Sequence, residues 1–334
     1  MAPLSRLAAW WRARWWRLLW QTQGPDYRWL LPQLSRLPLR LGFALAGLRD
    51  RLNGLLRRDW RSMSLGFPHI ATQSRQAFQM MAPQATPATL AKWVRGRFET
   101  ESRCDFEAYL VNQRRVAEMH CTLDQQDTAR QLREGNGKGL LLLIPHFDSF
   151  HLGTAFLGQH MAGSNRPIHA MSSAVFEDPR VHPALQDYVN GKYRLIEPYL
   201  NGGTVMHLEN GLRPFYRALE KGDMLVVLAD SPPLPNGVEM EVQFLGARRV
   251  LAGGAVKMAR RYDSQIAGFV CIQTGTGEYR LEFSRIIPVN DEGAVDEVYD
   301  FLSRQILAMP ERWCAADLLT QMPLAPPSPG QPAA

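Results

Sequence analysis

Cysteine is scarce in this chain of 334 residues, and the four cysteines lie far apart, at Cys104, Cys121, Cys271 and Cys314. No Cys-x-x-Cys pair occurs, so the sequence indicates neither a disulfide framework nor a zinc ribbon. A reduced, cytosolic setting is therefore the simpler expectation. Long apolar runs are also missing near the amino terminus, where no stretch approaches the roughly 18–20 uncharged residues that a bilayer-spanning helix needs.

Signals for several common classes of protein are absent as well. Arginine interrupts every apolar stretch near the amino terminus and no small-residue cleavage site follows, so a secretory signal is not expected. The chain has no G-x-S-x-G elbow, no P-loop and no G-x-G-x-x-G, and Ser149 lacks the flanking glycines of a nucleophile elbow. The sequence therefore gives no support to an elbow-type serine hydrolase, a P-loop enzyme or a dinucleotide-binding enzyme.

Lysine is absent from the first 61 residues, and acidic residues are rare there. This segment has twelve arginines and three aspartates, a net charge of +9, so the rest of the chain carries −3 of the overall +6. Such asymmetry indicates an anionic partner, either membrane phosphate or nucleic acid. Nucleic acid is the weaker interpretation, because the arginines are mixed with many leucines and tryptophans and no nucleic-acid-binding motif occurs.

The same segment alternates arginine with tryptophan and leucine. Residues 4–20 place leucines and tryptophans on one broad helical face with arginines beside it, and residues 37–61 repeat this chemistry. Tryptophan and arginine on one helix suit the interface of an anionic membrane. We expect residues 1–61 to form membrane-interface helices. The alternative is that these helices pack on the body and leave their arginines solvated.

The remaining chain divides into a domain at 62–320, helical up to about residue 138, and a Pro/Ala-rich tail at 321–334 that we expect to be disordered. From residue 139, strands alternate with helices, which indicates a mixed, largely parallel sheet flanked by helices. We expect the residues 274–277 to form a hairpin turn that makes the last strand pair antiparallel. The expected strands are 139–144, 167–172, 193–196, 224–229, 265–271 and 279–286, and the expected helices are 150–161, 179–190, 206–221, 253–262 and 295–309.

Three ionisable side chains follow the first of these strands. The apolar run 139–144 stops at Pro145, and His146, Asp148 and His151 come next. The carboxyl end of a strand is where an open α/β sheet usually places its chemistry, so His146 is a candidate base. Asp148 could instead cap the next helix, because aspartate is a favoured N-cap. The three side chains could also ligate zinc, although their spacing matches no familiar zinc signature.

Several blocks of the sequence resemble one known family. The histidine after an apolar strand resembles the H-x4-D/E block of the lipid A biosynthesis lauroyl/myristoyl acyltransferases, within the wider glycerolipid and lysophospholipid acyltransferase superfamily. Four later blocks resemble that family in the same order: residues 212–230, ending in Asp230; residues 237–246, with Phe-Leu-Gly; residues 252–259; and Pro-Glu-Arg-Trp at 310–313. The resemblance extends over about residues 64–318.

The resemblance implies an acyltransferase-like fold and a histidine that takes a proton from the acceptor hydroxyl, oriented by an acidic residue five positions later. That position is His151 in this chain. Asp148 could therefore have taken over the orienting role, or His151 could serve as a neutral hydrogen-bond partner. In a third interpretation the site is degenerate, and the protein binds lipid or acts as a scaffold without catalysis.

The resemblance also implies further site residues and partners. Arg248 and Arg249 would lie near the acceptor pocket, where a guanidinium pair suits phosphate, unless they are a solvated surface pair. Independently of the resemblance, Asp230 ends an expected strand on the same side of the sheet as His146, so it could face the same cleft. Arg213 and Arg217 share a helix face at i, i+4, and they could meet phosphate or be surface charge. The implied activity moves a fatty acyl chain from acyl carrier protein or acyl-CoA to a hydroxyl of a glycolipid or lysolipid, without a cofactor or metal. The implied location is peripheral, on the cytoplasmic face of the bacterial inner membrane.

Overall fold

The computed structural model describes residues 14–64, 70–173 and 179–326. These residues form a mixed α/β fold around one central sheet with the strand order β1-β9-β8-β2-β5-β3-β4, with β10 on β8. Neighbouring strands are parallel from β8 to β4, while β8 and β9 are antiparallel. The strands are β1 (His120–Thr122), β2 (Leu140–Ile144), β3 (Ile168–Ser172), β4 (Val205–His207), β5 (Met224–Leu228), β8 (Gln265–Gly275), β9 (Glu278–Phe283) and β10 (Ile287–Pro288). The predicted fold class is confirmed.

Strand β2 occupies the middle of this sheet. All five of its side chains are buried, as expected for a parallel strand with helices on both faces. Leu140, Leu142 and Ile144 point into one apolar core, and Leu141 and Leu143 point into the other. Packing on both faces of the sheet therefore fixes the position of β2, including its carboxyl end at Ile144.

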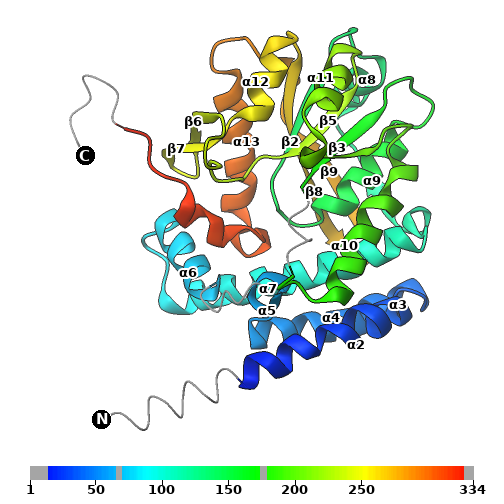
Figure 1. The fold of residues 1–334 in the computed structure, drawn as a ribbon, viewed down its shortest axis with the longest axis vertical. Coiled ribbons are helices and arrows are strands. Elements are labelled where there is room, and N and C mark those ends of the chain that lie inside the picture. The colour runs from blue at the N-terminus through cyan, green and yellow to red at the C-terminus, as the bar shows by residue number, and fades with distance from the viewer. Residues whose placement is uncertain (1–13, 65–69, 174–178, 327–334) are drawn as a thin grey trace.

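Helices cover both faces of the sheet (Figure 1). One core includes side chains from α7, α9 and α10, and the other includes side chains from α6, α11, α12 and α13. Gly153 allows α9 to approach β8 closely, because a Cβ at this position would lie 2.4 Å from the Cβ of Cys271. These helices are α6 (Ile70–Met81), α7 (Pro87–Asn112), α9 (Phe150–His160), α10 (Pro183–Ile196), α11 (Arg213–Glu220), α12 (Gly254–Arg261) and α13 (Ala294–Ala308), and α8 (Gln126–Glu134) precedes β2.

Two of the expected elements are wrong. Residues 193–196, expected as a strand, are the last turn of α10, and buried Val189 and Ile196 lie on one face of that helix. A short apolar run does not distinguish a strand from a buried helical turn. Residues 206–221, expected as one helix, form β4, a short 3₁₀ turn and α11. The helix expected at 179–190 is observed at Pro183–Ile196, and strand β1 at His120–Thr122 interrupts the segment expected to be helical up to about residue 138. The remaining expected elements match observed ones within a few residues, and the predicted antiparallel pairing of the last two strands is confirmed.

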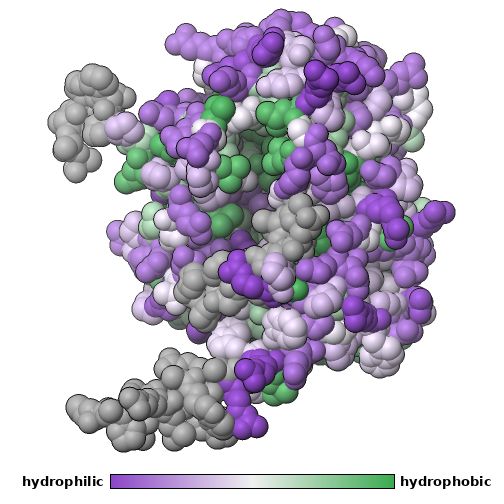
Figure 2. Space-filling view, viewed as in Figure 1, coloured by the Kyte–Doolittle hydropathy of each residue, from purple (hydrophilic) through white to green (hydrophobic). Residues whose placement is uncertain are grey.

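A two-stranded hairpin lies beside the main sheet, formed by β6 (Glu239–Phe244) and β7 (Ala247–Ala252). The described part of the expected disordered tail is attached to it, since Val250 N–H donates to Pro323 and Ala325 N–H donates to Arg248. Residues 327–334 lie outside the described residues. In the view of Figure 2, hydrophobic residues gather around a hollow between this hairpin and α11, on an otherwise largely hydrophilic face.

The amino-terminal helices form a layer at one end of the molecule, and α7 lies between this layer and the sheet (Figure 1). The layer contains the helical residues 14–21, α2 (Gln23–Pro25), a π-helical turn at Asp26–Leu30, α3 (Leu31–Leu34) and α4 (Leu39–Leu56), followed by α5 (Trp60–Ser64). Residues 1–13, which the sequence assigns to the first interfacial helix, lie outside the described residues. None of the described helices has the length and apolar character needed to cross a bilayer.

Candidate active site

His146 and Asp230 lie side by side because their strands are neighbours in register. Ile144 pairs with Leu228 in the parallel β2–β5 ladder, so residues two positions further along emerge together from the sheet. His146 Nδ1 lies 2.8 Å from Asp230 Oδ1, and the His146 backbone N–H donates to Asp230 Oδ2 at 2.9 Å. When Nδ1 carries the proton for this bond, Nε2 holds the lone pair of a base.

Asp230 is held in its ionised form by its surroundings. The carboxylate is completely buried, and burial by itself would raise its pKa. The electrostatic interaction with the neighbouring His146 and the hydrogen bonds from His146 and from the indole of Trp313 outweigh burial, so the pKa of Asp230 lies below its ordinary value. Trp313 Nε1 donates to Asp230 Oδ2 at 2.7 Å. The arrangement therefore has the parts of a histidine–carboxylate dyad.

Asp148 does not contact the His146 ring, which corrects the first of the three sequence interpretations. Its buried carboxylate forms ion pairs with Arg103 of α7 and with Arg312, the latter at 2.6 Å. Its backbone N–H donates to the Arg312 carbonyl at 2.8 Å. A φ of +49° at Asp148 turns the chain away from the strand direction. Asp148 thus ties the turn after β2 to α7 and to the carboxyl-terminal segment.

A second buried carboxyl lies beneath this turn. Glu107 Oε1 accepts hydrogen bonds from Ser149 at 2.9 Å and from Tyr279 at 3.1 Å. Burial raises the pKa of Glu107 to about 7, although the Arg103 guanidinium opposes that rise. The Ser149 side chain, which could have capped α9, bonds to Glu107 instead. The polar groups below His146 therefore belong to a network that holds the turn.

His146 opens onto a cavity of about 150 Å³ that also contacts β3, α9 and α10. His151, in the first turn of α9, lines it, and this imidazole is only 8% exposed with no hydrogen-bond partner at Nε2. Burial, with a further contribution from Lys192, holds the pKa of His151 well below its ordinary value, so the ring is neutral at neutral pH. The apolar part of the wall is formed by Ile144, Phe150, Ala170, Met171, Ile196, Val205, Val226 and Leu228.

Several cavity residues come from elements that the sequence did not associate with the site, among them Glu101 of α7. Trp60 and Arg61 reach the cavity from α5, and Lys192 reaches it from α10 with its ammonium 5.3 Å from the Phe150 ring centre. Arg61 also donates to the Cys314 carbonyl and to Asp317. The cavity thus combines an apolar wall with the charged side chains of Arg61, Glu101 and Lys192.

The four arginines expected to bind substrate lie elsewhere, and none is among the described residues that line the cavity. Arg213 and Arg217 are exposed on α11. Arg248 is exposed and pairs with Glu241 and Asp296 at about 3.5 Å. Arg249 is buried, and its guanidinium donates to the carbonyl of Met322. The side chain of Arg249 is therefore committed to the chain's own backbone.

The zinc arrangement considered from the sequence is not formed. Both carboxylate oxygens of Asp148 are engaged by arginines, so this residue does not join His146 and His151 as a ligand. Within residues 14–64, 70–173 and 179–326, no three His, Cys, Asp or Glu side chains are placed to hold a metal ion.

Comparison with known proteins agrees with the resemblance seen in the sequence. Comparison with individually curated proteins gave no match. The family model described as bacterial lipid A biosynthesis acyltransferase matches residues 71–315, which is most of the chain and includes His146, Asp230 and Trp313. The chain therefore belongs to the bacterial lipid A biosynthesis acyltransferase family.

Proposed function

We propose that the protein transfers a fatty acyl chain from a thioester, carried by acyl carrier protein or coenzyme A, to a hydroxyl group of a glycolipid or lysolipid. The observation that carries this proposal is the dyad of His146 and Asp230 at the wall of a partly apolar cavity. The family match supports acyl transfer in general. The donor, the acceptor and the base are our assignments.

In the proposed reaction, His146 Nε2 takes the proton from the acceptor hydroxyl as the hydroxyl oxygen bonds to the thioester carbonyl carbon. Asp230 fixes the tautomer of the ring and stabilises the imidazolium that forms. The tetrahedral intermediate then expels the thiolate, and the imidazolium returns the proton to the sulfur. No acyl-enzyme forms, and the products are an ester and a free thiol.

His151 is assigned to substrate binding in this mechanism. A buried imidazole nitrogen without a partner costs free energy unless a ligand completes its hydrogen bonding. As a neutral ring on the cavity wall, His151 can donate a hydrogen bond to the thioester carbonyl as negative charge develops there. This role differs from that of the acidic residue which the family resemblance implies at this position, and Asp230 takes that role from a neighbouring strand.

The chemical environment of the cavity supports lipid-type substrates. Its wall is mainly aliphatic and aromatic, which suits an acyl chain, and the ammonium of Lys192 suits an anionic group on the donor or acceptor. The basic amino-terminal segment supports a location at a membrane surface, which we propose to be the cytoplasmic face of the bacterial inner membrane.

Incubating the purified full-length chain with acyl carrier protein or coenzyme A thioesters and a panel of lysolipid and glycolipid acceptors tests this proposal. Mass spectrometry should detect an acylated lipid with the wild-type protein and not with His146→Ala. Lipid binding without product for any donor and acceptor would instead favour the non-catalytic alternative, in which the fold is kept for binding or scaffolding.

A further inference from the structure

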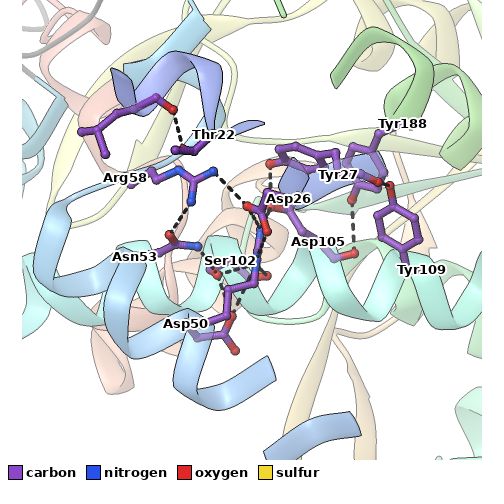
Figure 3. A network of polar contacts seen from close by, with 12 residues as sticks. Thr22, Asp26, Tyr27, Asp50, Asn53, Arg58, Ser102, Asp105, Tyr109 and Tyr188 are labelled. Atoms are coloured by element: carbon purple, nitrogen blue, oxygen red, sulfur yellow. Dashed lines mark hydrogen bonds and ion pairs between the residues drawn. The ribbon is translucent and has the colours of Figure 1, made fainter. Parts of the chain in front are cut away.

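Helix α4 presents two faces of opposite character, and its inner face is fixed to the body. Arg49 on this face is 8% exposed and donates to Asp26 Oδ1 at 2.8 Å and to Ser102 Oγ at 2.6 Å on α7. Asn53 also donates to Ser102 Oγ at 2.8 Å. Figure 3 shows this network between α4, α7 and the preceding turn. The orientation of α4 on the body is therefore set by a buried polar network, which determines which face points outward.

The outer face of α4 carries a row of leucines. At about 100° per residue they fall within about 80° of one another around the helix. A leucine row of this kind normally packs against another element or a partner. Its members and their exposed fractions are Leu41 (47%), Leu45 (37%), Leu48 (58%), Leu52 (53%) and Leu55 (63%).

The apolar surface extends beyond α4. Trp29 is 65% exposed, and a groove of about 550 Å³ between it and the row also contacts Leu30 and Leu34. Trp15 (50%) and Leu18 (53%) are exposed on the preceding helical segment. We call the five leucines together with Trp29 the leucine face.

The exposed charged side chains of the described amino-terminal segment, residues 14–61, are all arginines. The three aspartates of the first 61 residues, Asp26, Asp50 and Asp59, are all buried, at 5%, 8% and 6% exposure. The arginines Arg36, Arg40, Arg51 and Arg57 are exposed. Arg40 and Arg51 lie on one flank of the leucine row on α4, about 80–100° from its centre. The outward surface of this layer is thus apolar and positively charged.

We propose that the leucine face binds the surface of an anionic bilayer. Leucine and tryptophan would enter the boundary between headgroups and acyl chains, while Arg40 and Arg51 meet lipid phosphates. A second copy of the chain fits this surface less well. A two-fold contact through α4 would bring the same arginines of both copies together, with no exposed aspartate in the segment to compensate.

The position of α4 connects this surface to the proposed reaction, and this part of the inference rests on the proposed function. Trp60 and Arg61 follow α4 by only a few residues and line the cavity of His146. The leucine face and the catalytic cavity are therefore joined by a short, packed segment. Binding through α4 would keep the cavity near the surface from which a lipid acceptor comes.

Vesicle binding of the full-length protein tests the inference. The wild type should cosediment with vesicles of phosphatidylglycerol and phosphatidylethanolamine, and Leu48→Ser/Leu52→Ser should lower the partition coefficient about tenfold or more. The matched control is Met80→Ser/Leu307→Ser, which removes side chains of 46% and 43% exposure elsewhere on the surface and should leave binding unchanged. Arg40→Gln/Arg51→Gln should weaken binding to these vesicles about tenfold but not change the weak binding to phosphatidylcholine vesicles.

Several results would overturn the inference. They are absence of wild-type binding, equal binding by the double leucine variant, or a wild-type dimer that this variant dissociates while vesicle binding persists. Acyl transfer to an acceptor in detergent micelles keeps the two proposals distinguishable. The leucine variant should retain transfer in micelles if the reaction is correctly assigned, whatever the vesicles show.

Discussion

The Nδ1 atom of His146 lies 2.8 Å from Oδ1 of Asp230, a residue 84 positions later in the chain. The sequence places a histidine, not an acid, five positions after His146, and the nearer carboxylate of Asp148 is engaged by two arginines. The carboxylate that contacts the proposed base therefore comes from the neighbouring strand. We therefore expect replacement of Asp230 to affect the chemistry and replacement of Asp148 to affect the stability of the fold.

Replacing Asp148 should affect stability more than chemistry. Asp148→Asn weakens a buried double ion pair and leaves Arg103 and Arg312 under-compensated, so we expect the free energy of unfolding to fall by about 3 kcal/mol. Folded protein should retain acyl transfer within about tenfold of wild type, because the His146–Asp230 contact is untouched. Urea denaturation and transfer rates per folded molecule measure the two effects. A loss of activity with unchanged stability would place Asp148 in the chemistry instead.

Replacing Trp313 tests the support of Asp230. Trp313→Phe removes the indole hydrogen bond to Oδ2 while keeping an aromatic side chain in the core. Loss of a hydrogen bond to a buried charged group costs about 1.5–3 kcal/mol. Because this bond favours the ionised carboxylate, the pKa of Asp230 should rise in the variant, and the acidic limb of the pH–rate profile should move to higher pH. An unchanged profile would show that His146 alone sets the ionisation of Asp230.

His151 should matter for transfer and little for stability. We expect His151→Ala to lower kcat/KM by about tenfold to a hundredfold, as for removal of an oxyanion donor, and His151→Gln to restore part of that loss. The pH–rate profile should keep its shape, because the wild-type ring stays neutral at neutral pH. Equal rates for wild type and His151→Ala would remove this residue from the mechanism.

Glu107 should make stability depend on pH in a predictable direction. Its pKa is raised from 4.5 to about 7 in the folded protein, so the folded state binds this proton more tightly than the unfolded state. Its contribution to stability is therefore fully present below pH 4.5 and is lost as the pH rises through about 7. Relative to Glu107→Gln, the wild type should lose up to about 3 kcal/mol of unfolding free energy across this window. Parallel stability curves for the two proteins would contradict the raised pKa.

The largely parallel sheet and the end of strand β2 just before His146 were predicted correctly from the sequence, because both depend on local patterns. The apolar run of β2 and the turn residues of the β8–β9 hairpin lie within short windows. The prediction of a strand at Tyr193–Ile196 was wrong because a run of four mostly apolar residues fits a strand and a helical turn equally well. Helix α10 is instead fixed by burial of its Val189 and Ile196 side in the core.

The partner of His146 could not be read from spacing along the chain. Asp230 was considered for the cleft because it ends a strand on the same side of the sheet, but its contact with His146 depends on β5 lying directly beside β2 in register. That pairing is a tertiary property. The burial of Arg249 under Met322 is another such property, since an Arg-Arg pair in a sequence carries no information about which side chain points inward.

The central claim is that His146 acts as a base oriented by Asp230. The most direct measurement is the rate of acyl-lipid formation by Asp230→Asn, which keeps the shape of the buried side chain, alongside His146→Ala. We predict losses of about 10²–10⁴ in kcat for both single variants and no further loss in the double variant, because the two residues act as one unit. Near-wild-type transfer by Asp230→Asn, with the fold intact by circular dichroism, would contradict the account.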